Sequence, residues 1–376
     1  MLHCTSDKAV RLLYAALFVL AVVTTDAFGY GPIGHEIVGA IADERLSHTP
    51  AWAKVAALID GFSLEKAAVI ADEIKGWDKR GADDPHIFHF TAHPQVDAQL
   101  REFWKANPPT KDRNSPIPSH HWFHYCDVSV ASNQKYQDGS LGRTRWDLVH
   151  MTAYCIKVLR GDIPEQNERK ITRPLAVILL AHYLGDIHQP LHVGAEYFDK
   201  NGNPTDGSHG GEILEDQGGN TLTFSSLARL PITGNFTKKL HGFWDNDCVM
   251  ANLPALADTM PKEERRAQML AARRELVTRW SREEPKDWRV AAETPQSYAE
   301  ALANEALPLA REAHARLRFS GVHAQQDETG AVFASGEAEE RPASDNLTYA
   351  EWSRNVVGSE LHKAGWRLAE LLQQVR

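Results

Sequence analysis

Residues 182–192, HYLGDIHQPLH, carry side chains of the kind that bind zinc. His182 and Asp186 are four residues apart, so a helix would place both on one face. His192 follows the helix-breaking Pro190, where the backbone can turn its side chain toward a different point. Zinc accepts neutral imidazole and carboxylate donors at about 2.0–2.2 Å. The segment therefore predicts a metal site.

Similar donors recur elsewhere in the chain. The further candidate ligands are His35, Asp72, His124, His241 and Asp245. Taken singly, each has an ordinary explanation, because buried histidines usually form hydrogen bonds in the core and a His–Asp pair one helical turn apart is usually a weak surface pair. Two such pairs together with a histidine beyond a proline favour metal binding instead. We predict structural or surface positions for His89, His93, His150 and His188.

The composition describes a folded chain with a net negative charge. The 376 residues include 41 Lys plus Arg and 50 Asp plus Glu, which gives −9 with neutral histidine. Hydrophobic residues at 43% and charged residues at 24% exclude an intrinsically disordered chain. The negative charge argues against broad electrostatic attraction to duplex DNA or to an anionic membrane. We expect no membrane or protein partner and a monomer.

The N-terminal residues resemble an export signal. Two basic residues precede the apolar run 12–23, which is shorter than the roughly 20 residues that span a bilayer. Small residues at the −3 and −1 positions indicate cleavage before Tyr30. We therefore predict a signal peptide over 1–29 and a secreted or periplasmic protein, with a short membrane anchor as the alternative.

Four cysteines are too few for a disulfide scaffold. Removal of the signal would take Cys4 away and leave Cys126, Cys155 and Cys248. Export permits a disulfide bond between two of these three, and the sequence leaves the pairing open.

Helical periodicity dominates the remaining sequence. We predict helices over 35–46, 63–75, 146–159, 172–190, 238–253, 261–280, 295–319 and 349–376. Loops are predicted over 78–119, 199–219 and 325–345, and one short strand or hairpin arm over 220–227. No repeat or linker is evident. The pattern predicts a single all-α domain over 30–376, with 78–119 and 325–345 as loop insertions.

The motifs, taken in order, resemble those of a known family. They are His35, Asp72, His124, the HYLGDIHQPLH block, GGN at 218–220, LHGFWD at 240–245 and AGWRLAELL at 364–372. The chain resembles the zinc-dependent single-strand-specific nucleases of fungi and plants, which have 3′-nucleotidase activity and share their helical fold with zinc phospholipase C. The resemblance covers nearly all of residues 30–376.

This resemblance implies three zinc ions. By motif position, the ligands are Asp72, His124, His182 and Asp186 for the first ion, the amino nitrogen and carbonyl oxygen of Tyr30 with His35 and Asp186 for the second, and His192, His241 and Asp245 for the third. The α-amine of Tyr30 becomes a ligand only after the bond between residues 29 and 30 is cut, so the resemblance also implies accurate signal cleavage.

Such a centre would attract and hydrolyse phosphodiesters. Three divalent ions and three carboxylates leave the pocket positive by about three charges, and bound cations dominate local electrostatics. Paired zinc ions lower the pKa of a shared water toward about 7. The resemblance implies attack of a zinc-activated hydroxide on phosphorus, stabilisation of the departing 3′ oxygen by the third ion, and 5′-nucleotides as products. Single-stranded DNA, single-stranded RNA and 3′-nucleotides are the expected substrates.

Further residues are assigned around the ions. The assigned catalytic residues are Asp72, Lys75 and Asp127, and the assigned substrate-binding residues are Tyr125, Lys75 and Asn246. Lys75 matches a basic family position and would contact the phosphate, and Asp127 would orient His124 or the water. Tyr125 matches an aromatic position that can stack on an unpaired base. An ordinary surface lysine and a core tyrosine are the alternatives.

Two other functions are open at this point. A phospholipase C on the same scaffold would present apolar loops to a membrane, whereas residues 199–211 are polar and 78–119 is rich in proline. A secreted zinc-binding protein without catalysis would hold metal without turnover.

Overall fold

The computed structural model describes residues 30–110, 112, 115–207, 212–225, 238–257, 259–327 and 330–374. The predicted signal peptide over 1–29, with Cys4, lies outside the described residues. Among the described residues, no helix combines the length and the hydrophobicity that a bilayer-spanning segment requires.

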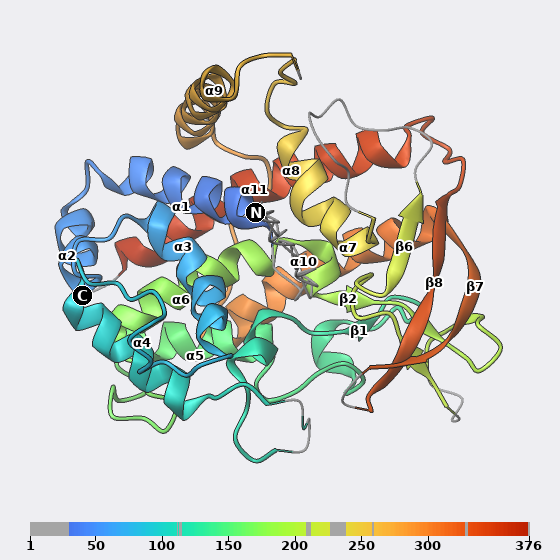
Figure 1. The fold of residues 1–376 in the computed structure, drawn as a ribbon, viewed down its shortest axis with the longest axis horizontal. Coiled ribbons are helices and arrows are strands. Elements are labelled where there is room, and N and C mark those ends of the chain that lie inside the picture. Colours follow the sequence, from blue (N-terminus) through green and yellow to red (C-terminus); the bar gives the residue numbers. More distant parts are fainter. Residues whose placement is uncertain are drawn as a thin grey trace, which may run out of the picture.

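Most of the described chain is helical (Figure 1). The α-helices are α1 Pro32–Leu46, α2 Pro50–Leu58, α3 Leu64–Glu73, α4 Pro94–Ala106, α5 Leu148–Arg160, α6 Arg173–Asp186, α7 Leu240–Gly242, α8 Cys248–Met250, α9 Lys262–Arg282, α10 Pro295–Ala315 and α11 Tyr349–Gln373. Shorter helical turns are η1 Ile74–Trp77, η2 His120–His124, η3 Tyr136–Asp138, η4 Pro190–His192 and the π-helical η5 Phe243–Asp247.

Helix α6 lies at the centre of the helical part. Every residue from Leu175 to Asp186 is buried, and α1, α3, α5 and α11 pack against the helix. The Thr172 hydroxyl accepts a hydrogen bond from the Leu175 amide, and Pro174 occupies the first turn, so the helix begins as predicted. A helix that is apolar on all sides requires this enclosure. The enclosure also removes His182 from solvent.

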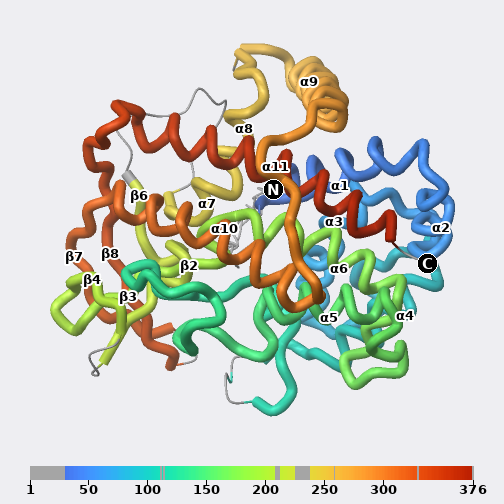
Figure 2. The backbone as a smooth tube through the Cα atoms, turned by 180° about the vertical axis from the view of Figure 1, so that it is seen from behind, coloured from blue at the N-terminus to red at the C-terminus, as the bar shows by residue number. Residues whose placement is uncertain are grey.

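The C-terminal helix is confirmed as well. Thr348 and Glu351 form a reciprocal capping box at the start of α11. The side chains of Leu361, Leu368 and Leu372 on this helix are fully buried. Helix α11 lies behind α1 in Figure 1 and in front of it in Figure 2, and the two helices are in contact.

The all-α prediction is wrong in one part of the molecule. Strands β7 Leu317–Gln326 and β8 Val332–Glu340 form an antiparallel hairpin, although the sequence predicts the end of a helix and a loop there. Strand β6 Leu222–Ser225 pairs parallel to β8. The strand predicted over 220–227 is therefore confirmed, whereas the loop over 325–345 is not. The sequence of β8, VFASGEAEE, has little hydrophobic alternation, and pairing with two neighbouring strands satisfies its backbone.

Short strands complete two further small sheets among the described residues. They are β1 Val128–Ser129, β2 Gly194–Ala195, β3 Tyr197–Phe198, β4 Pro204–Thr205 and β5 Leu214–Glu215. Strands β4 and β5 interrupt the loop predicted over 199–219. The described chain is thus mostly helical with small sheets at one end (Figure 1).

The loop predicted over 78–119 contains a helix. Within α4, the side chains of Val96, Leu100 and Phe103 are spaced by helical turns and buried in the core. The polar, proline-rich composition around this segment concealed its apolar stripe. Helix α4 therefore packs beside η2, where Phe103 lies against the rings of His120 and Phe123.

The three cysteine residues that the structure describes do not pair with one another. Cys126, Cys155 and Cys248 are buried free thiols, which contradicts the predicted disulfide bond. The thiol of Cys126 hydrogen-bonds the Val193 carbonyl and that of Cys248 the Ser353 hydroxyl, so these residues lie in separate surroundings.

Candidate metal centre

Eight predicted side-chain ligands converge in the interior. They are His35 on α1, Asp72 on α3, His124 on η2, His182 and Asp186 on α6, His192 on η4, His241 on α7 and Asp245 in η5. Each is at most 8% exposed, so these donors are shielded from water. The structure groups them into His35–His182–Asp186, Asp72–His124–His182 and His192–His241–Asp245, each with ligand atoms within 4.8 Å of one another.

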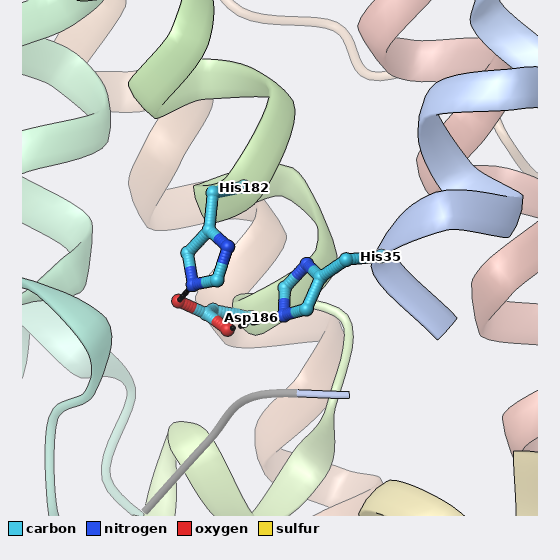
Figure 3. Close-up of side chains that lie close together, drawn as sticks. All are labelled: His35, His182 and Asp186. Carbon is cyan, nitrogen blue, oxygen red and sulfur yellow. Dashed lines mark ion pairs between the residues drawn. The ribbon is translucent and has the colours of Figure 1, made fainter. Parts of the chain in front are cut away.

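Asp186 is the hub of the first two groups. Its Oδ1 lies 3.3 Å from Nε2 of His35, and its Oδ2 lies 3.2 Å from Nε2 of His182 and 3.1 Å from Nδ1 of His124. Figure 3 shows His35 and His182 approaching the two oxygens of this carboxylate from different helices. Oδ1 of Asp186 and both ring nitrogens of His35 have no hydrogen-bond partner, although all are buried. Unsatisfied buried donors and acceptors of this kind indicate a ligand.

A glycine makes this approach possible. A Cβ atom on Gly185 would lie 2.5 Å from Nδ1 of His35, closer than any side chain tolerates. The Gly-Asp sequence in HYLGDIHQPLH therefore brings α1 against the end of α6. This contact places His35 beside Asp186.

Asp72 faces the same pocket from α3. Its Oδ1 lies 3.7 Å from Nε2 of His182 and 3.8 Å from Nδ1 of His124, and it accepts a 2.8 Å hydrogen bond from Nζ of Lys75. Burial opposes ionisation, but the nearby Lys75 ammonium and the histidines lower the pKa of the Asp72 carboxyl. The residue is therefore a carboxylate at neutral pH.

The third group consists of His192, His241 and Asp245. Nε2 of His241 is 3.0 Å from Nε2 of His192 and 3.2 Å from Oδ2 of Asp245. The amide of Gln189 donates a 2.8 Å hydrogen bond to Oδ1 of Asp245. Asp245 belongs to the π-helical turn η5, and widened turns of this type recur at functional sites.

The backbone fixes the tautomers of three histidines. Nδ1 of His182 lies 2.6 Å from the Ala68 carbonyl, Nδ1 of His192 lies 2.7 Å from the His124 carbonyl, and Nδ1 of His241 lies 2.7 Å from the Gly218 carbonyl. Because a carbonyl only accepts, each Nδ1 must donate, and the lone pair of each neutral ring is on Nε2. Metal-binding histidines are oriented in this way by their second nitrogen.

The two lone pairs of the third group require a cation between them. Nε2 of His192 and Nε2 of His241 face each other at 3.0 Å, and neither carries a proton when both rings are neutral. Two such lone pairs repel, whereas a shared divalent ion accepts both. The donor set therefore suits zinc on the basis of its own geometry.

The carboxyl groups respond differently to burial. Burial raises the pKa of Asp245, and the neighbouring Asp186 and Asp72 raise it further against the Gln189 hydrogen bond. Burial also opposes ionisation of Asp186, but the close imidazoles of His182, His124 and His35 lower its pKa. A divalent ion would stabilise both carboxylates, because metal binding displaces protons from its ligands.

Tyr30 lies beside the third group. The residue is fully buried, its hydroxyl donates to the His188 carbonyl at 2.8 Å, and the next amide, of Gly31, donates to the Asp245 carbonyl at 2.9 Å. The start of α1 is thus held against η5. Ligation by the main-chain atoms of Tyr30 stays a prediction.

The other predicted site residues belong to none of the three donor groups. Lys75 is buried beside Asp72, while Tyr125 and Asp127 line a cavity of about 420 Å³ with Trp146 and Arg143. Asn246 is exposed, and its side chain lies against Gly31, where an added Cβ would be 2.2 Å from its Oδ1. Their catalytic and binding roles stay predictions.

Sequence reasoning missed two features. Gln189, which holds Asp245, lies inside the HQPLH motif, so its position beside the ligands was the available signal. A further His/Asp group, Asp78 with His120 and His121, lies outside the predicted set. The adjacent histidines at 120–121 are the one sequence feature that could have indicated this group. His89, His93, His150 and His188 belong to none of the groups of possible metal ligands found among the described residues.

Comparison with known proteins gives consistent results. The family model described as S1/P1 Nuclease matches residues 30–376. Endonuclease 2 of Arabidopsis thaliana is 24% identical over 242 residues, which are 64% of this chain and 60% of that protein. Endonuclease 4 of the same plant is 37% identical over 71 residues, 19% of this chain and 15% of that protein. Both alignments span less than two thirds of the relative.

The family match covers almost all of the chain and includes all eight converging ligands. It agrees with the resemblance inferred from the motifs. The chain belongs to the S1/P1 nuclease family, a family of zinc-dependent hydrolytic nucleases.

Proposed function

We propose that this protein is a zinc-dependent phosphodiesterase that hydrolyses single-stranded DNA and RNA to 5′-nucleotides and removes the phosphate of 3′-nucleotides. The observation that carries the proposal is the buried assembly of histidines and carboxylates around Asp186 and His192. Membership of a family of hydrolytic nucleases supports the reaction type.

Three ions are proposed, with ligands as the motifs assign them. Asp72, His124, His182 and Asp186 would hold the first, Asp186 and His35 with the main chain of Tyr30 the second, and His192, His241 and Asp245 the third. The three groups of donors within 4.8 Å support this division. When bound, zinc supplies a Lewis acid for phosphate oxygens and lowers the pKa of water that can attack phosphorus.

The residues themselves favour an anionic substrate. Three divalent ions exceed the charge of Asp72, Asp186 and Asp245 by about three units, so the pocket is positive within a chain of net charge −9. Lys75, which donates to Asp72 at 2.8 Å, adds a cation at the same point. We propose that its ammonium donates a hydrogen bond to a phosphate oxygen of the substrate.

The neighbouring cavity suits an unpaired base. Tyr125, Trp122 and Trp146 supply aromatic faces around about 420 Å³, next to Asp127. Stacking of one base on an aromatic side chain contributes about 1–3 kcal/mol. A duplex hides its base faces, so this cavity would favour single strands. We propose that Tyr125 stacks on the base and that Asp127 orients His124 or the attacking water. We propose that Asn246 contacts the substrate.

Export and cleavage before Tyr30 are part of the proposal. The family match begins at residue 30, and Gly31 is anchored to Asp245 at 2.9 Å, both of which support a functional chain start at this point. N-terminal sequencing of protein secreted by its host should begin at Tyr30. A chain that retains residues 28 and 29 should lose activity.

One assay panel tests the function. Purified protein should hydrolyse single-stranded DNA, RNA and a 3′-mononucleotide, and a chelator should abolish all three activities until zinc is restored. Phosphatidylcholine should remain intact. Lipid turnover without nucleic acid hydrolysis would instead indicate a phospholipase C, and zinc binding without any turnover would indicate a non-catalytic protein.

A further inference from the structure

A second place in the molecule gathers metal-binding side chains. Asp78 follows η1, and His120 and His121 begin η2, so the group joins two segments more than forty residues apart. Their ligand atoms lie within 4.8 Å of one another. None of the three belongs to the ligand sets assigned above.

The ring nitrogens of His120 have no hydrogen-bond partner. The side chain is 1% exposed, and neither Nδ1 nor Nε2 forms a hydrogen bond. Its Nε2 lies 3.4 Å from Oδ1 of Asp78. A buried imidazole whose nitrogens form no hydrogen bond leaves both polar atoms unsatisfied, and a cation bound to the lone pair of Nε2 would satisfy one of them.

The distances suit a shared cation. Two zinc ligands at tetrahedral angles are about 3.3–3.5 Å apart. The distance of 3.4 Å between Nε2 of His120 and Oδ1 of Asp78 falls in this range. In the main pocket, the corresponding distances from Nε2 to a carboxylate oxygen are 3.2 Å for His182–Asp186 and for His241–Asp245. Nε2 of His121 is closer to Oδ2 of Asp78, at 2.6 Å, as in a direct hydrogen bond that an ion would lengthen.

The carboxylate is already oriented by a neighbour. Nε1 of Trp104, on α4, donates a 2.9 Å hydrogen bond to Oδ1 of Asp78. Such outer hydrogen bonds hold metal ligands in position. Asp78 and His121 are partly exposed, with 20% and 27% of their side chains accessible, so an ion can enter from solvent.

We propose that Asp78, His120 and His121 form an additional site for a divalent transition ion of the zinc type, with water completing its coordination. Two imidazoles and one carboxylate are a common donor set for such ions, and water fills the remaining positions. The ion fastens the end of η1, which carries Lys75, to η2, which carries His124. It also joins both to the insertion through Trp104. The inference concerns metal content and stands independently of the proposed catalytic reaction.

Metal counting on the full chain tests this site. Protein equilibrated with a modest excess of zinc sulfate and freed of loose metal by gel filtration is measured by elemental analysis. We expect the His120→Gln/His121→Gln variant to bind one zinc fewer per chain than the unchanged protein. His121→Gln alone, at a partly exposed position, should show the same loss if the double variant does not fold.

His150→Gln is the matched control. His150 contacts the carboxylate of Asp147 at 3.1 Å, and within the described part of the chain this pair belongs to no group of three possible metal ligands. Its substitution should leave the zinc count unchanged. An equal count in the unchanged protein and in the His121 variants would overturn the additional site and leave Asp78 as a hydrogen-bond acceptor only. The zinc content of Asp186→Asn tests the main pocket separately. Failure of the proposed function and failure of the additional site can therefore be told apart.

Discussion

Two buried His–Asp pairs in this molecule share one geometry. Nε2 of His182 is 3.2 Å from Asp186, and Nε2 of His314 is 3.2 Å from Asp216. In both rings Nδ1 lies against a backbone carbonyl, that of Ala68 or of Ala310. In these two contacts the pairs are equivalent, but the residues around them differ.

The difference lies in what else faces the carboxylate. Asp186 also faces His35 and His124, whereas Asp216 accepts from the Glu196 amide. Burial lowers the pKa values of His35 and His124, so these rings are neutral and offer lone pairs.

At the His314–Asp216 pair, a single proton on the imidazole balances the charge of the carboxylate. Burial opposes protonation of His314, but the Asp216 hydrogen bond and charge raise its pKa to about 9. A single imidazole beside a carboxylate thus makes an ion pair, and several make a metal site. The group at Asp78, with two imidazoles, lies between these extremes.

Replacing Asp186 and replacing Asp216 should give the largest difference in activity between the two regions. Asp186→Asn should lower the rate of single-stranded DNA hydrolysis at least about a thousandfold, because metal ions supply several kcal/mol to such a transition state. Its zinc content should fall as well. Asp216→Asn should keep its zinc. Elemental analysis and initial rates check both variants, and full activity in Asp186→Asn would contradict the metal assignment.

Chelation should affect stability through the main pocket. Zinc that binds only the folded chain stabilises it by several kcal/mol, so removal should lower the melting temperature by about 10 °C. Calorimetry with and without chelator measures the shift, and added zinc should reverse it. The same shift should persist in His314→Gln, because that histidine is not a ligand. A melting temperature insensitive to chelator would contradict the proposed ions.

Lys75 should have an intermediate effect. Its ammonium donates to Asp72 at 2.8 Å, and a charged hydrogen bond to a phosphate is worth about 1.5–3 kcal/mol. Lys75→Ala should therefore slow hydrolysis about 10- to 100-fold with zinc retained. Lys75→Arg restores the charge and should recover part of the rate. Loss of zinc in Lys75→Ala would instead make the lysine a support for Asp72.

The main pocket could be predicted because its spacing is local. His182 and Asp186 occupy one face of a helix that Thr172 caps, and His241 and Asp245 repeat this spacing, so four ligands follow from helical periodicity. The contact of Asp78 with His121 joins residues 43 positions apart, and only the folding of the insertion creates it. Short-range pattern contains no signal for such a contact.

The hairpin was missed for a related reason. In β8 the residues that face the core are small, Ala334 and Ala338, so the strand lacks the alternation of large apolar side chains that predicts one. Its conformation depends on β6 and β7, and β6 pairs with it from more than a hundred residues away. Tertiary pairing decided the structure where local preference was weak.

The smallest expected effect is the pH response of the Asp216 pair. The pKa of His314 is about 9 in the folded chain against an ordinary value of 6.5, so its protonated form stabilises the fold. This contribution is complete below pH 6.5 and is lost as the pH rises through 9. Burial raises the pKa of Glu196 from 4.5 to about 7, so folding favours its protonated form too and acts in the same direction.

In zinc-saturated protein, the free energy of unfolding should therefore fall between pH 6.5 and 9 by about 1–2 kcal/mol more than in His314→Gln. Denaturant titrations at three pH values measure this difference. His323→Gln is the control, since His323 is exposed and its Nδ1 contacts only the Gly321 carbonyl at 2.8 Å. It should retain the pH dependence of the unchanged protein. Equal slopes in the His314 variant and the unchanged protein would mean that Asp216 does not stabilise a protonated ring, and the contrast with Asp186 would then rest on the number of histidines alone.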